Sequence, residues 1–169
     1  SELQAINLGT ITLRSGGSFI SGVLATLTVG SQFAGSLVVN ANSVLNAAGT
    51  ITGNLMNLGR VSVGAGFALT VQGSMTSLAG SIIQIDIASA ASYGRLNISG
   101  TATLGGTFRA NFINSYIPTA GTLFTSLLTY TSRTANSTFT SIEALNLPAP
   151  RALTPDYTTD STRFSLLTT

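Results

Sequence analysis

The chain is built from short runs of alternating side chains that glycine interrupts every few residues. Thr10 to Leu13, Leu24 to Val29 and Ile82 to Ile87 are three such runs. Alternation with a period of two and an excess of β-branched residues is typical of β-strands that bury one face. No segment keeps helical spacing over three turns, and the nearest candidate, Ala88 to Ser92, is expected to be a loop. The sequence therefore predicts an all-β fold.

Glycine and proline divide the chain into two zones. Seventeen of the 18 glycines lie between Gly9 and Gly106, whereas all four prolines come later. Irregular short strands that turn at glycine favour a short parallel β-solenoid (β-helix) over residues 1–106. Residues 107–169 are expected to form a β-sandwich-like, β-rich cap with proline turns. Its strands are predicted at 107–113, 122–130, 137–142 and 162–167. The alternative architecture is a single β-sandwich or jelly roll.

The side chains that are missing exclude most chemistry. The sequence contains no histidine, cysteine, lysine or tryptophan, and only seven arginines and five acids carry charge. Most groups used for proton transfer, thiol chemistry and transition-metal binding are therefore absent. A net charge of +2 spread along the chain does not indicate nucleic-acid binding. No apolar run is long enough for a membrane helix. We expect a non-enzymatic protein without a cofactor or a metal.

One pair of acids could act as a site. Asp156 and Asp160 lie four residues apart and could form a carboxylate pair of the glycosidase kind. The same two side chains, with backbone carbonyls, could hold a calcium ion. The simpler interpretation, which we favour, is a polar loop between two strands.

A further set of motifs links the chain to a known family. The motifs are Asn57 to Gly64, Leu69 to Gly73, Leu96 to Thr107 and the strands from Tyr116 to Phe139. Together they cover about half of the chain, and they resemble the terminal rungs and cap of autotransporter-type passenger and adhesin β-solenoids. The membrane barrel that ends such proteins is not among them. The resemblance implies an extracellular or cell-surface location and a structural or adhesive role.

The opening segment is expected to mediate self-assembly. The chain begins without a polar capping element, and an uncovered rung offers unpaired backbone groups to another chain. Head-to-tail contacts that do not close into a ring produce filaments. We therefore expect copies of the chain to assemble into a filament or surface layer, with an apolar set of contact residues: Leu3, Ala5, Ile6, Leu8, Ile11 and Leu13.

The second function class is a glycan- or surface-binding adhesin or tail-fibre module. Its binding face would be an exposed aromatic cluster around Tyr116, Tyr130 and Tyr157, although these rings could equally fill the core of the cap. A possible glycosylation acceptor is Asn136 in the sequon Asn136-Ser137-Thr138.

Overall fold

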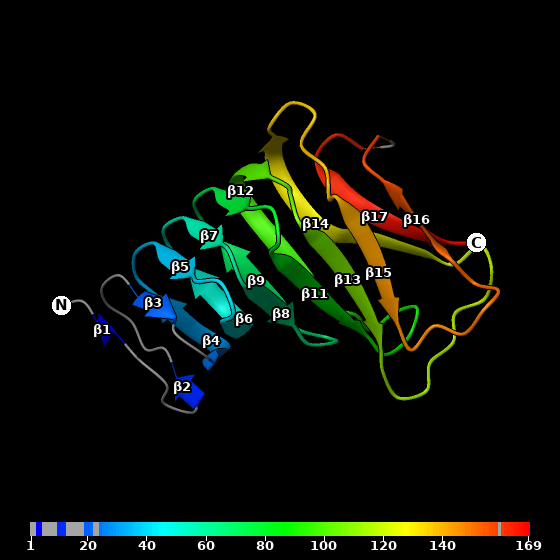
Figure 1. The fold of residues 1–169 in the computed structure, drawn as a ribbon, viewed down its shortest axis with the longest axis horizontal. Coiled ribbons are helices and arrows are strands. Elements are labelled where there is room, and N and C mark those ends of the chain that lie inside the picture. Colours follow the sequence, from blue (N-terminus) through cyan, green and yellow to red (C-terminus); the bar gives the residue numbers. More distant parts are fainter. Residues whose placement is uncertain (1–2, 5–9, 13–18, 22–23, 159) are drawn as a thin grey trace.

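A computed structural model describes residues 3–4, 10–12, 19–21, 24–158 and 160–169, and the side chains from residue 32 onward. The described residues form β-strands and turns, with no helix among them. This confirms the all-β class. Most of the strands pair in parallel within one large sheet that winds around a common core (Figure 1).

Three parallel ladders run along the molecule, and we label them A, B and C. Each ladder adds one strand, or part of one, at every turn of the chain. Some strands bend at a register shift and contribute to two ladders. Ladder A contains β1 (Leu3–Gln4), β3 (Phe19–Ser21), β5 (Leu37–Val39), β7 (Leu55–Asn57), β10 (Met75–Ser77) and the later halves of β12 (Arg95–Thr103) and β14 (Leu123–Arg133).

The other two ladders share the same winding. Ladder B contains β2 (Thr10–Thr12), the first halves of β4 (Leu24–Phe33) and β6 (Val44–Ile51), β8 (Arg60–Val63), β11 (Ile82–Ile87), β13 (Thr107–Phe112) and β15 (Ser141–Leu145). Ladder C contains the later halves of β4 and β6, β9 (Ala68–Val71) and the earlier parts of β12 and β14. This parallel, coiled connectivity is compatible with the β-solenoid-like fold that the glycine pattern predicts.

The turns of the chain become longer toward the carboxyl end. Leu37 pairs with Leu55, 18 residues further on, whereas Ile98 pairs with Tyr130, 32 residues further on. The molecule accordingly widens from the blue strands to the yellow and red ones (Figure 1). We call the region around β2 and β4 the narrow end and the region around β15 and β17 the wide end.

Antiparallel strands cover part of the wide end. β17 (Arg163–Thr168) pairs antiparallel with β14, and β16 (Leu153–Asp156) pairs antiparallel with β17. Parallel pairing continues across residue 106, because β13 pairs with β11 and with β15. The division into domains at 106/107 therefore stays a prediction. Among the described strands, the antiparallel pairs are those that involve β17.

The core consists of rows of inward side chains that follow the ladders. In ladder B one row runs through Leu45, Val61, Ile83 and Phe108, all fully buried. Aromatic rings fill the wider turns: the Phe108 ring centre lies 4.7 Å from that of Phe164 and 5.3 Å from that of Phe139. Larger side chains thus fill the larger cross-section.

Most of the predicted strands are confirmed, and one is shifted. The loop expected at Ala88 to Ser92 is a turn closed by a bond from Ala88 N–H to Ser92 O. The strand predicted at 137–142 instead begins at Ser141 and ends at Leu145. Asn136 has a positive φ of 59°, and Ser137 N–H bonds Thr134 O, so residues 134–137 form a turn. Because of this turn, β15 begins later in the sequence than predicted.

Candidate functional site

The two candidate acids lie on the outer face of the antiparallel strands at the wide end. Asp156 ends β16, and Asp160 lies in the turn that leads to β17. Both line a hollow of about 210 Å³, together with Leu123, Thr125, Arg163 and Ser165. The structure therefore brings the predicted pair to one place.

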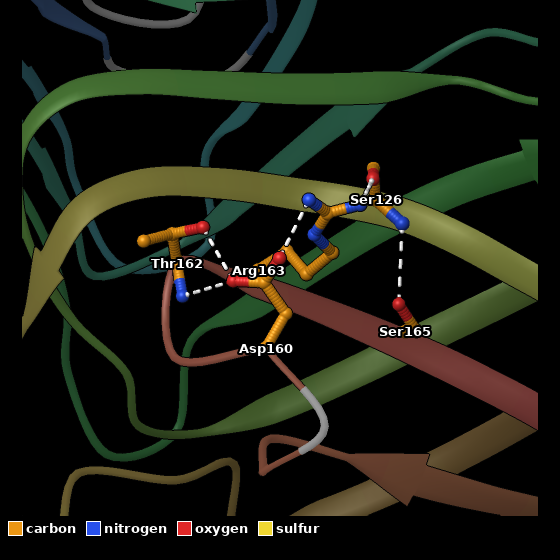
Figure 2. A network of polar contacts seen from close by, with 5 residues as sticks. All are labelled: Ser126, Asp160, Thr162, Arg163 and Ser165. Carbon is orange, nitrogen blue, oxygen red and sulfur yellow. Dashed lines mark hydrogen bonds and ion pairs between the residues drawn. The ribbon is translucent and has the colours of Figure 1, made fainter.

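Asp160 is held by its own turn. Its Oδ1 accepts hydrogen bonds from the Thr162 backbone N–H at 2.8 Å and from the Thr162 hydroxyl at 2.5 Å, and its Oδ2 lies 2.5 Å from Arg163 Nη2 (Figure 2). The Thr162 hydrogen bonds hold the pKa of Asp160 below its ordinary value, and the Arg163 charge lowers it further. A general acid needs a raised pKa, whereas these bonds favour the deprotonated carboxylate of Asp160.

Asp156 makes the equivalent local bonds. Its Oδ1 accepts from the Thr158 backbone N–H at 2.9 Å and from the Thr158 hydroxyl at 3.3 Å. A bond from an aspartate to the backbone two residues later is the signature of an Asx turn. Arg163 Nη1 also donates to Ser126 Oγ at 3.3 Å, and Ser126 N–H donates to Ser165 Oγ at 3.2 Å (Figure 2). These contacts fasten the β16–β17 turn to β14.

This arrangement fits the polar-loop interpretation better than a catalytic or calcium site. Calcium needs six to eight oxygen ligands, usually including several carboxylates. Within the described part of the chain, no group of three or more histidine, cysteine, aspartate or glutamate side chains could hold a metal ion. The cluster holds two turns in place through the Asp156 and Asp160 side chains, and it contains one ion pair, between Asp160 and Arg163.

The three tyrosines pack against the core. Tyr130 is 3% exposed, and Tyr157 is half-buried with its ring centre 5.0 Å from that of Phe164. The Tyr157 hydroxyl accepts a hydrogen bond from Phe139 N–H at 3.1 Å. Burial raises the pKa of both hydroxyls above the ordinary value. Tyr116 is half-buried beside Phe112. Of the two readings of these tyrosines, the structure favours the one in which they fill the core of the wide end.

The remaining predicted residues are only partly placed. Asn136 is exposed in its turn, and its glycosylation stays a prediction. The backbones of Leu3 and Ile11 lie on ladders A and B, in β1 and β2. Ala5, Ile6, Leu8 and Leu13 fall outside the described residues, as do the side chains of Leu3 and Ile11.

Sequence reasoning missed two hollows on the outer face of ladder B. One, of about 470 Å³, is lined by Val44, Arg60 and Ile82 among other residues. The second, of about 410 Å³, is lined by Asn46, Ala47, Ala48, Ser62, Gly64, Phe67 and Asp86. The one signal in the sequence is Phe67, a large apolar residue that directly follows the turn Gly64-Ala65-Gly66.

Comparison with known proteins finds no matching family model, no matching curated protein and no matching solved structure. In the described residues, no helix has the length and apolar character needed to cross a membrane. The fold and its surface thus define the class: an all-β protein with a large parallel sheet of solenoid-like winding.

Proposed function

We propose that the chain is a non-enzymatic, extracellular structural subunit whose copies join head to tail into a filament or surface layer. The contact is the continuation of ladder B, in which β2 of one copy adds in parallel to β15 of the next. The resemblance to autotransporter-type passenger and adhesin solenoids belongs to this proposal and supports the extracellular location.

The observation that carries the proposal is the register of ladder B. One continuous row of paired residues runs from Thr10 in β2 to Ser141 in β15, through Leu24, Val44, Arg60, Ile82 and Thr107. Among the described strands, β2 pairs only with β4, and β15 pairs only with β13. Within the described residues, each of these strands therefore has one edge without a ladder, and such an edge is a template for another strand.

The wide end also leaves apolar positions uncovered. Phe108 and Ala110 of β13 are fully buried, whereas their partners in β15, Ile142 and Ala144, are half-buried and exposed. Ladder C differs, because β17 covers it at the same end. A second copy would bury the inward positions of β15 and supply the missing ladder partner. The turns at the narrow end are shorter than those at the wide end, so the two ends cannot match along all three ladders. The proposed contact is therefore confined to ladder B.

The charge distribution suits close association. The Arg109 and Glu143 side chains, on neighbouring strands of ladder B, lie 2.8 Å apart and neutralise each other near this edge. The whole chain carries only twelve charged side chains, with a net charge of +2. A low net charge favours association.

The proposal predicts that Ala144→Lys prevents assembly and leaves the fold intact. A lysine at an inward position of an edge strand blocks strand addition, because pairing would bury its charge. We expect the wild type to show polymers in negative-stain images and in sedimentation velocity. The variant should sediment as a monomer with the circular dichroism spectrum of the wild type.

The matched control is Ala90→Lys, which adds the same charge at an exposed position of the turn after β11. This variant should polymerise like the wild type. Polymers of undiminished length from Ala144→Lys, or a wild-type chain that stays monomeric at every concentration tested, would contradict the proposal.

A further inference from the structure

The 410 Å³ hollow on ladder B contains a half-exposed aromatic ring that the fold holds in place. Phe67 is 49% exposed, and its backbone N–H bonds Gly64 O at 3.1 Å. The ring lies over Gly64, where an added Cβ would come within 3.2 Å of Phe67 Cδ2. A further bond from Arg95 N–H to Phe67 O ties the turn to β12. The sequence therefore provides an exposed flat apolar surface in a fixed position.

Polar groups without partners face the same hollow. Ser62 is only 9% exposed, and its hydroxyl has no hydrogen-bond partner among the described residues. Asn46, its partner in the outward row, lines the hollow with its amide group likewise unpaired within that part of the chain. The Ser62 hydroxyl and the Asn46 amide can therefore form hydrogen bonds with a ligand in the hollow.

Asp86 supplies an oriented hydrogen-bond acceptor. Its Oδ1 accepts from Asn111 Nδ2 at 2.8 Å and from Gln84 Nε2 at 3.2 Å. In the part of the chain that the structure describes, its Oδ2 accepts no bond. The two amides fix the carboxylate plane and leave one oxygen for a donor that enters the hollow. Of the described residues that line this hollow, Asp86 is the charged one.

The neighbouring 470 Å³ hollow extends the surface along the strands. Val44 and Arg60 line it, and they lie two residues before Asn46 and Ser62 on the same strands. Side chains two apart on a strand point to the same face, about 7 Å from each other. The two hollows thus form one elongated surface that can contact an extended ligand.

We propose that this surface binds an extended, neutral glycan, with one pyranose ring packed on Phe67. The C–H face of the ring covers the aromatic side chain, and the sugar hydroxyls bond to Asp86 Oδ2, Ser62 Oγ and the Asn46 amide. An apolar platform with a few fixed polar groups is the usual form of a small-molecule site. The joined surface carries one carboxylate, Asp86, and one guanidinium, Arg60, so its charges balance and suit a neutral ligand. This activity is additional to the structural role and does not depend on ladder B assembly.

The test is isothermal titration calorimetry of the full chain with four linear hexasaccharides. Three are neutral, namely cellohexaose, maltohexaose and N-acetylchitohexaose, and the fourth is the anionic hexagalacturonate. We expect at least one neutral hexasaccharide to bind, and its association constant to fall about tenfold or more in Phe67→Ala, as expected for the loss of a stacking contact. Asp86→Asn, which keeps the shape of the side chain, should also weaken binding several-fold.

The matched control is Leu123→Ala, which truncates another side chain that is 49% exposed, away from the hollow. It should bind as the wild type does. Circular dichroism establishes that each variant is folded. Absence of binding by all three neutral sugars, binding of hexagalacturonate alone, or equal binding by a folded Phe67→Ala would overturn the inference. If Phe67→Ala still forms polymers, a failure of the glycan-binding inference leaves the assembly proposal intact.

Discussion

Phe108→Ala is expected to lower the free energy of unfolding by about 3–5 kcal/mol. Phe108 is fully buried in the ladder B row, between Ile83 on one side and Ile142 on the other. Its ring also contacts Phe139 and Phe164, and Phe164 belongs to the antiparallel strands of the wide end. Truncation therefore leaves a cavity where the parallel and antiparallel strands meet, and stacked strands cannot close it without losing their register.

The measurement is urea unfolding followed by circular dichroism, on the non-assembling Ala144→Lys background. Phe67→Ala is the matched control, because it makes the same substitution at a half-exposed ring. It should cost about 1 kcal/mol or less, since surface substitutions have small effects. Equal losses for the two variants would show that the aromatic cluster does not hold the wide end together.

Gly106→Ala is the second substitution with a large expected effect. Gly106 has φ of +68°, and an added Cβ would lie 2.8 Å from Leu78 O and closer still to Ser81 O. Its carbonyl accepts the Thr140 N–H at 2.7 Å, so the residue joins the corners of three successive turns. The variant would strain its own dihedral angles and push two turns of the chain apart. We expect a loss of several kcal/mol in the free energy of unfolding, or a chain that does not fold.

Gly121→Ala separates the cost of backbone strain from the cost of the contact with the neighbouring turn. Gly121 also has a positive φ, of +86°, but nothing lies within 4 Å of an added Cβ. Its substitution should cost only the backbone strain, about 1–2 kcal/mol. The difference between the two variants in urea unfolding measures the close approach of the turns. A loss for Gly106→Ala no larger than that for Gly121→Ala would contradict the tight stacking.

The longer strands could be predicted because their own residues define them. In β11 the alternation places Ile83, Ile85 and Ile87 inward, and all three are fully buried. The three-residue strands β5, β7 and β10 carry too little local pattern, and their partners in the adjacent turns define them instead. Asn57 shows that a polar residue in a strand cannot always be assigned to the exposed face. It points inward, fully buried, and its amide donates to Ile82 O at 3.0 Å.

The candidate sites could be predicted only where their residues are close in sequence. Asp156 and Asp160 meet because a single turn separates them, and each is held by the threonine two residues later. The hollow at Phe67 instead gathers residues from three turns of the chain, with Asn46 opposite Ser62 and Asp86 on the following strand. Since paired positions of the described parallel strands lie between 14 and 34 residues apart, spacing alone does not reveal which residues stack.

Engineered disulfides between copies test the assembly most directly. If ladder B continues from one copy to the next in its own register, Thr10 of one copy lies opposite Ser141 of its neighbour. Adjacent strands lie about 4.8 Å apart, within the Cα separations that a disulfide spans. The natural sequence has no cysteine, so a chain with both Thr10→Cys and Ser141→Cys has no competing thiol. Oxidation should give a ladder of covalent multimers on a non-reducing gel, whereas the Thr10→Cys and Ala90→Cys pair should not. A Thr10→Cys and Ser141→Cys chain that remains monomeric after oxidation would contradict head-to-tail continuation of ladder B.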